Sequence, residues 1–138
     1  MITAVDTNVL LDVCAGNQEF SSASTDKLRI CMKEGSLVVC ELVWAELAGV
    51  FPASGEMATI LKNLGIAFSP CSAATATKAG ETWRKYRSAG GARSRMIADF
   101  MIGAHALIQC DRLLTRDRGF YRSHFTSLII VDPASSRR

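Results

Sequence analysis

A chain of 138 residues, 49% of them hydrophobic and 21% charged, is sized for one domain and can build a substantial core. This composition excludes an intrinsically disordered chain. The net charge of +3 conceals an asymmetry, because residues 1–77 carry four Lys or Arg and eight Asp or Glu, whereas residues 78–138 carry twelve and five. A basic C-terminal half indicates a polyanionic partner such as nucleic acid, although a solvated basic surface explains the same bias.

Targeting segments and cysteine motifs are not evident in the sequence. The N-terminal residues lack the basic and apolar segments of a signal peptide. The apolar windows 37–51 and 96–110 contain acids and are shorter than the roughly 20 residues that span a bilayer. Five cysteines without a C-x-x-C pair suggest neither a zinc site nor a disulfide framework. We therefore expect a soluble, cytoplasmic protein with buried thiols and no membrane association.

In the first half of the chain, two short apolar strands precede predicted helices. Residues 2–6 form a strand that ends in an acid, and residues 9–15 follow as a helical turn in which Asp12 is exposed or caps the helix. Ser24 or Thr25 is expected to cap a helix that runs to Glu34. Residues 37–40 form the second strand, and residues 42–51 form a helix that Pro52 ends.

The second half repeats this alternation. Residues 54–63 and 72–88 have helical spacing, with a third strand at 65–68 between them, and residues 93–109 give the strongest helical pattern. Strands follow at 112–115 and 128–131. Short apolar strands that alternate with helices predict a parallel sheet covered on both faces. We expect one domain over residues 1–133 and a short tail at 134–138.

Four carboxylates stand at positions that are unusual for surface acids. Asp6 and Asp117 follow predicted strands, whereas Glu46 and Asp99 lie inside apolar helical segments. In open α/β sheets, ligands bind outside the carboxyl ends of the strands. Each acid alone also has an ordinary explanation, such as a turn former or a gap in the packing. The interpretation therefore depends on the four acids as a set.

A hard divalent cation explains how four acids could share one pocket. Without a cation, mutual repulsion would force some of them to take up protons. Magnesium prefers oxygen ligands, and such a site can orient an attacking water and neutralise charge on a phosphate. Gly103 and Ala106 share a helix face with Asp99, which would let that helix approach the sheet closely, although ordinary helix packing demands the same.

The four acids lie in the segments Asp6-Thr-Asn-Val-Leu-Leu-Asp12, Trp44-Ala-Glu-Leu47, Arg95-Met-Ile-Ala-Asp-Phe-Met-Ile-Gly-Ala-His-Ala-Leu107 and Leu113-Leu-Thr-Arg-Asp-Arg-Gly-Phe-Tyr-Arg122. These segments resemble the PIN-domain family and, within it, the VapC-like toxin ribonucleases. They occur in the family's order and extend over nearly the whole chain, while residues 52–92 match nothing distinctive.

The resemblance implies a three-layer α/β/α sandwich with a parallel sheet of about five strands. It also implies that Asn8 orients Asp6 and that Thr115 holds a ligand or water, although a turn amide and an ordinary strand threonine remain equally open. Magnesium or manganese would be the cofactor. The catalytic and metal-binding cluster would consist of Asp6, Glu46, Asp99 and Asp117.

The implied activity is that of an endoribonuclease toxin, which hydrolyses RNA phosphodiester bonds with a metal-activated water. The implied partners are an RNA substrate, a second copy of the chain in a homodimer, and a cognate antitoxin. In VapC-like proteins the C-terminal segment of the antitoxin occupies the active-site groove and often places a basic side chain among the acids.

Several other residues could contact RNA or simply pack. Trp83 and Tyr86 could stack on bases or line an antitoxin groove, or belong to the core or a dimer interface. His105 is expected to pack, and His124 to lie solvated in a basic loop. Four arginines flank the acidic segments and could hold RNA phosphates, or form a solvated face; they are Arg93, Arg95, Arg116 and Arg118.

Two other functions remain as alternatives. A non-catalytic PIN-like module that binds RNA or a partner would keep the fold, but all four acids are present here. The second alternative is a phosphatase of the haloacid-dehalogenase type, a family with an Asp-x-Asp motif after its first strand. Asn8 stands where that motif needs its second acid, and no downstream lysine is well placed.

Overall fold

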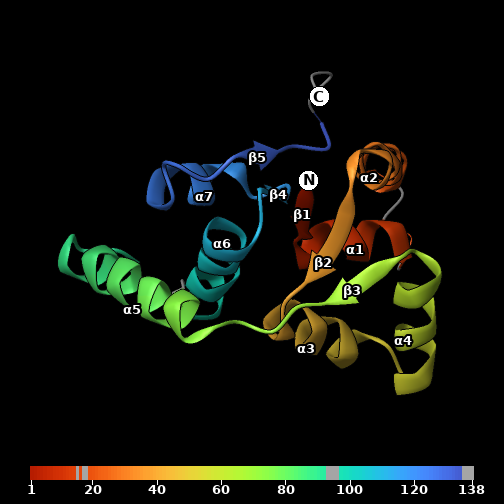
Figure 1. The fold of residues 1–138 in the computed structure, drawn as a ribbon, viewed down its shortest axis with the longest axis horizontal. Helices are drawn as coiled ribbons and strands as arrows, with labels where there is room; N and C mark the ends of the chain where they lie inside the picture. The colour runs from red at the N-terminus through yellow and green to blue at the C-terminus, as the bar shows by residue number, and fades with distance from the viewer. Residues whose placement is uncertain (15, 17–18, 93–96, 135–138) are drawn as a thin grey trace.

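The structure is a computed structural model that describes residues 1–14, 16, 19–92 and 97–134. Within these residues, five parallel strands form one sheet in the order β3-β2-β1-β4-β5 (Figure 1). This sheet confirms the predicted α/β fold. The strands are β1 (Ile2–Val5), β2 (Ser36–Val39), β3 (Ile66–Phe68), β4 (Arg112–Leu114) and β5 (Ile130–Val131).

Helices connect successive strands and make the outer layers. In Figure 1, α5, α6 and α7 lie on one side of the sheet, and α1, α2 and α4 lie on the other. None of the helices in the described residues is both long and apolar enough to cross a membrane. The helices are α1 (Thr7–Cys14), α2 (Ser21–Glu34), α3 (Glu41–Val50), α4 (Ser54–Asn63), α5 (Ala73–Ser88), α6 (Ile97–Gln109) and α7 (Arg118–His124).

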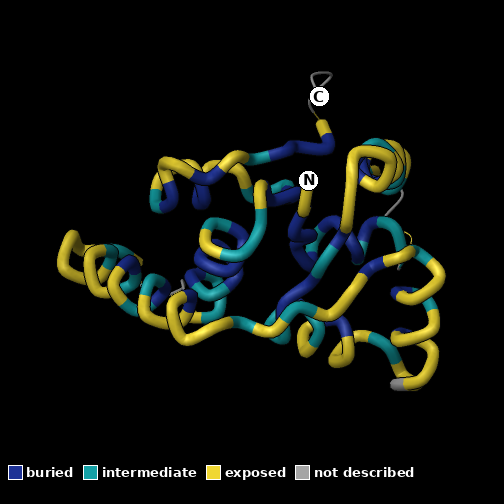
Figure 2. The backbone as a smooth tube through the Cα atoms, in the orientation of Figure 1, coloured by how far each residue is buried: buried dark blue, intermediate teal, exposed yellow. Residues whose placement is uncertain are grey.

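The central strands are buried on both faces, as Figure 2 shows by colour. Residues 3–5 of β1 and 112–114 of β4 are buried without alternation, which is typical of parallel strands between two helical layers. From β1 the chain first adds β2 and β3 on one side and later β4 and β5 on the other. The sheet therefore has its topological switch point between β1 and β4, where open α/β sheets bind ligands.

The prediction that Asp12 is exposed or caps a helix was wrong. Asp12 is neither exposed nor a cap, because its side chain is 1% exposed and accepts two hydrogen bonds from Arg116, at 2.7 and 3.1 Å. Helix α2 begins at Ser21 rather than at the predicted caps, and the Ser24 hydroxyl donates to Asp12 Oδ2 at 2.6 Å. Local spacing could not reveal this ion pair, since its partners are 104 residues apart.

The prediction for His124 was also wrong, whereas that for His105 is confirmed. His124 ends helix α7 and lies half-buried against the rings of Tyr86 and Phe120, each with its centroid 5.0 Å away. The inward-facing aromatic residues of this short helix anchor it to the core. His105 is 1% exposed, and its Nε2 lies 3.0 Å from Ser69 Oγ.

The close approach at Gly103 gives a test of the packing. A Cβ added there would lie 2.4 Å from the Phe125 ring, so the contact is with the residue that follows α7. We expect Gly103→Ala to lower the free energy of unfolding by about 1–3 kcal/mol through overpacking. Gly80→Ala is the control, because that helical glycine has open space around it and should gain up to ~1 kcal/mol. Equal effects in urea unfolding would contradict this account.

Candidate active site at the ends of strands β1 and β4

The four acids singled out in the sequence line one pocket of about 230 Å³. Two of them follow neighbouring strands: Asp6 comes directly after β1, and Asp117 lies between β4 and α7. Glu46 projects from α3, and Asp99 lies in the first turn of α6. Asp117 occupies the N-cap position of α7, but its side chain does not cap that helix. The structure thus brings together acids from four separate segments at the switch point of the sheet.

Hydrogen bonds position Asp6 firmly in the pocket. It is 6% exposed, and its Oδ1 accepts a hydrogen bond from the Thr7 backbone N–H at 2.8 Å. Its Oδ2 accepts from the Thr115 hydroxyl at 2.8 Å and from Asn8 Nδ2 at 3.3 Å. These donors come from both strand ends, so they fix the carboxylate across the β1–β4 pair.

Asn8 and Thr115 also connect Asp6 to the segment that carries Asp117. Asn8 Oδ1 accepts from the Arg116 backbone N–H at 3.1 Å, and Thr115 Oγ1 accepts from the Asp117 backbone N–H at 3.0 Å. Thr115 is fully buried. Its hydroxyl therefore holds two of the acidic segments in register.

The pocket disfavours uncompensated negative charge. The pKa of Asp6 is raised from its ordinary 3.8 to about 6, mainly by burial and to a smaller extent by the Glu46 carboxylate. Hydrogen bonds from Thr115 and Thr7 oppose this rise. Glu46 is exposed at the rim, yet partial burial of its carboxylate raises its pKa too, and Asp99 adds to that shift. Oxygen donors that resist ionisation in this way are suited to a divalent cation, which would favour their charged forms.

The raised pKa of Asp6 predicts how stability depends on pH in metal-free protein. A raised folded-state pKa stabilises the fold below 3.8, and this contribution is lost as the pH rises through about 6. At about 1.4 kcal/mol per pKa unit, the full loss is about 3 kcal/mol, and most of it, about 2 kcal/mol, falls between pH 4 and pH 8. We expect the unfolding free energy of the wild type to fall by this amount relative to Asp6→Asn, in urea titrations with EDTA. Parallel pH profiles of the unfolding free energy for the two proteins would show that the pKa of Asp6 is not raised in the folded state.

Two polar residues of the pocket, Thr7 and Tyr121, were not singled out from the sequence. The Thr7 hydroxyl donates to Glu46 Oε1 at 3.2 Å and so holds the rim acid. Tyr121 is 2% exposed, and its hydroxyl interacts with Asp6. Burial and the neighbouring acids raise the pKa of Tyr121 above its ordinary value, so it stays a neutral donor. Both residues lie inside the segments that resemble the PIN family, but side-chain direction in α1 and α7 was needed to find them.

The arginines have different surroundings. Arg116 forms an ion pair with Asp12 and stacks on the Phe20 ring, with its guanidinium carbon 4.0 Å from the ring centroid. Arg118 pairs with Asp132 at 2.5 Å, although 56% of its side chain stays exposed. The predictions for Arg93 and Arg95 lie outside the described residues. Of the two arginines that the structure describes, Arg118 therefore has the more exposed side chain, and RNA binding by either stays a prediction.

The aromatic pair on α5 packs within the protein. The Tyr86 ring lies 5.2 Å from that of Phe100, and its hydroxyl donates to the Ala92 carbonyl at 2.7 Å. Trp83 is half-buried beneath the Arg87 guanidinium, 4.2 Å from the ring centroid. Tyr86 thus closes the turn after α5 rather than presenting a free stacking surface.

Several solved structures share this fold. The chain matches a chain of the VapBC2 complex of Rickettsia felis, bound to a DNA fragment from its promoter, with 19% identity and a TM-score of 0.73, covering 96% of this chain and 98% of the other. It matches VapBC-1 of nontypeable Haemophilus influenzae with 16% identity and a TM-score of 0.73, covering 98% and 100%. It matches the DNA-bound VapBC of Salmonella typhimurium with 14% identity and a TM-score of 0.72, covering 97% of this chain and 99% of the other.

The sequence comparisons agree with the structural ones. No curated protein matches the sequence. The family model of the PIN domain matches residues 3–125, which include all four pocket acids. Because this match extends over most of the 138 residues, the chain belongs to the PIN-domain family.

Proposed function

We propose that this protein is a metal-dependent endoribonuclease that acts as the toxin of a toxin–antitoxin pair. The observation that carries the proposal is the convergence of Asp6, Glu46, Asp99 and Asp117 on one pocket of a PIN domain. PIN domains generally bind divalent metal ions. The all-oxygen donor set and the raised pKa values of Asp6 and Glu46 fit magnesium or manganese.

In this proposal the four carboxylates hold the cation, and the neighbouring side chains hold the carboxylates. When bound, the ion would orient and activate the attacking water and neutralise charge that develops on the RNA phosphate. Thr115 and Asn8 fix the orientation of Asp6, and Thr7 fixes Glu46. This rigidity is what a site needs, because misplaced catalytic groups lose much of their effect.

The proposed partners follow from the same pocket. The solved structures of similar fold are described as VapBC and other toxin–antitoxin complexes. A basic side chain from an antitoxin could occupy an anionic pocket of this kind and compete with the metal. We also propose that the protein forms a homodimer. We propose that it acts in the cytoplasm, because cellular RNA is found there.

The proposal is tested by incubating the purified, antitoxin-free chain with total cellular RNA. Discrete cleavage products are expected with Mg²⁺ or Mn²⁺ and none with EDTA. Sequencing of the cut ends would then identify the substrate. Metal binding without cleavage of any RNA class would instead favour a non-catalytic binding module.

A further inference from the structure

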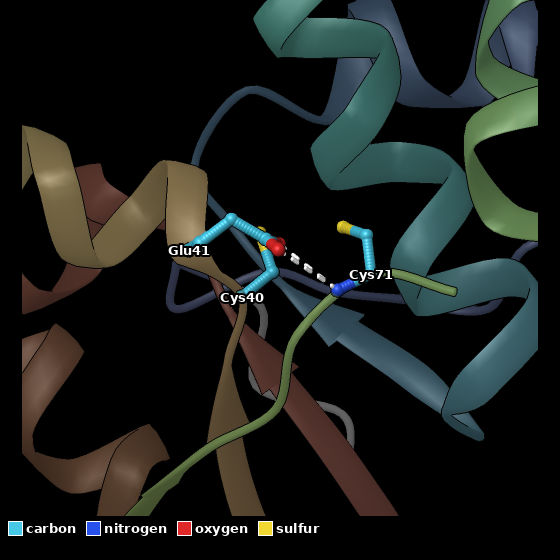
Figure 3. Close-up of side chains that lie close together, drawn as sticks. All are labelled: Cys40, Glu41 and Cys71. Carbon is cyan, nitrogen blue, oxygen red and sulfur yellow. Dashed lines mark hydrogen bonds between the residues drawn. The ribbon is translucent and has the colours of Figure 1, made fainter. Parts of the chain in front are cut away.

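A second group of metal-ligating side chains lies outside the acid pocket. Cys40 and Glu41 stand where β2 ends and α3 begins, and Cys71 lies in the segment between β3 and α5. One ligand atom from each of the three lies within 4.8 Å of the others. Figure 3 shows the side chains directed toward one another from these two segments. None of the three lines the acid pocket.

Hydrogen bonds already hold this group together. Both Glu41 carboxylate oxygens accept from the Cys71 backbone N–H, at 3.0 and 3.1 Å. Cys40 is the N-cap residue of α3, and its side chain makes no capping hydrogen bond. Burial raises the pKa of the Cys40 thiol and outweighs the backbone N–H groups of Leu42 and Val43 at this helix N-terminus, which lower it. The hydrogen bonds between Cys71 and Glu41 place the Cys40 and Cys71 backbones before any ligand binds.

The group lacks a positive charge of its own. Burial raises the pKa of the Cys40 thiol, and burial together with the Glu41 carboxylate raises that of Cys71. His105 is near Glu41, but its Nε2 lies 3.0 Å from Ser69 Oγ. A cation bound between the sulfurs and the carboxylate would supply the missing charge and favour both thiolates.

We propose that Cys40, Cys71 and Glu41 form a Zn²⁺ site, with water as the fourth ligand. Two thiolates and a carboxylate are a zinc-type donor set, and thiolates favour zinc over magnesium or manganese. Zn–S bonds of about 2.3 Å place tetrahedral sulfur ligands about 3.8 Å apart. The ligand atoms now lie within 4.8 Å of one another, so binding requires the two sulfurs to approach by about 1 Å at most and each sulfur–oxygen pair by about 1.3 Å at most, which rotation of the side chains can supply.

The consequence is a chain with two metal sites of different chemistry. The acid pocket offers only carboxylate oxygens, whereas the Cys40–Glu41–Cys71 group offers sulfur. Zinc in the second site would cross-link the segment before α5 to the start of α3, the helix that carries Glu46. The cysteine spacing in the sequence did not indicate such a site, because Cys40 and Cys71 come from different segments and no C-x-x-C pair is present.

The test is a zinc titration of the reduced, metal-stripped full chain against a chromophoric chelator. Asp6→Asn and Asp99→Asn are included in every protein, so that the acid pocket does not contribute. We expect one Zn²⁺ per chain, and with Co²⁺ a thiolate-to-metal charge-transfer absorption. Affinity should fall at least ~100-fold in Cys40→Ser and Cys71→Ser, because even partners outside the ligand shell cost roughly 10–100-fold.

Cys14→Ser is the matched control, since Cys14 is half-buried like Cys71 but ends helix α1 and is not one of the three grouped residues. It should retain full affinity, and Glu41→Gln should bind zinc more weakly than the parent. Circular dichroism checks that each variant is folded. Absence of the cobalt–thiolate absorption in the parent protein would overturn the proposal even if every cysteine variant misfolds. Equal zinc affinity in parent, Cys40→Ser and Cys71→Ser would also overturn it.

Discussion

Asp99→Asn is expected to lower the rate of RNA cleavage by on the order of 10²–10³-fold, with the fold retained. The substitution keeps the shape of the side chain but removes one negative charge from the pocket. A catalytic metal stabilises transition-state charge by several kcal/mol, and about 1.4 kcal/mol corresponds to each tenfold change in rate. The measurement is the single-turnover rate on the RNA identified by total-RNA cleavage, at saturating Mg²⁺.

The control for this loss is Asp26→Asn, which removes an exposed carboxylate from α2 outside the pocket. Its cleavage rate should match that of the wild type. Comparable rates for Asp99→Asn and Asp26→Asn would point to a contaminating nuclease or to a different active site. Urea unfolding of both variants separates a lost charge from a lost fold.

Arg116→Met is expected to lower the free energy of unfolding by about 3–5 kcal/mol. The substitution removes the Arg116 guanidinium from the Asp12 carboxylate, which is 1% exposed, and leaves the Ser24 hydroxyl as the hydrogen-bond donor to it that the described residues show. Breaking a buried ion pair from one side has a cost of this size, because an uncompensated charge stays buried. The measurement is equilibrium unfolding in urea at pH 7.

A double substitution distinguishes this cause from lost packing on Phe20. Asp12→Leu combined with Arg116→Met removes both charges and should recover most of the lost stability. The two residues tie α1 to the segment after β4, so an activity defect in Arg116→Met should disappear in the double variant as well. A double variant as unstable as the single one would show that the charge is not the cause.

The sequence predicted the strands and the four acids because their signals are local. Each strand is a short apolar run; Asp6 follows β1 directly, and Asp117 lies three residues after the end of β4. Parallel pairing of β1 with β4 then brings the strand ends together without further information. Glu46 and Asp99 stood out as acids inside apolar helical segments, and the order of segments in the PIN family supported all four acids, since periodicity alone does not fix how those helices are oriented.

The errors and omissions concern contacts between distant segments. The Asp12–Arg116 pair and the Cys40–Glu41–Cys71 group each join residues that are 30 or more positions apart. Helix α7 was not predicted because it has only seven residues, and most of its stabilisation comes from Phe120 and Tyr121 packing inward. Tertiary contacts of this kind leave no periodic pattern in the sequence.

We propose above all that divalent metal held by the pocket acids drives RNA cleavage. The most direct test measures Mn²⁺ binding by electron paramagnetic resonance and the cleavage rate in the same samples, for the wild type and Asp99→Asn. We predict that the wild-type rate rises in proportion to occupancy of a Mn²⁺ site that Asp99→Asn weakens. A cleavage rate that is independent of Mn²⁺ occupancy, or unchanged in Asp99→Asn, would contradict the account.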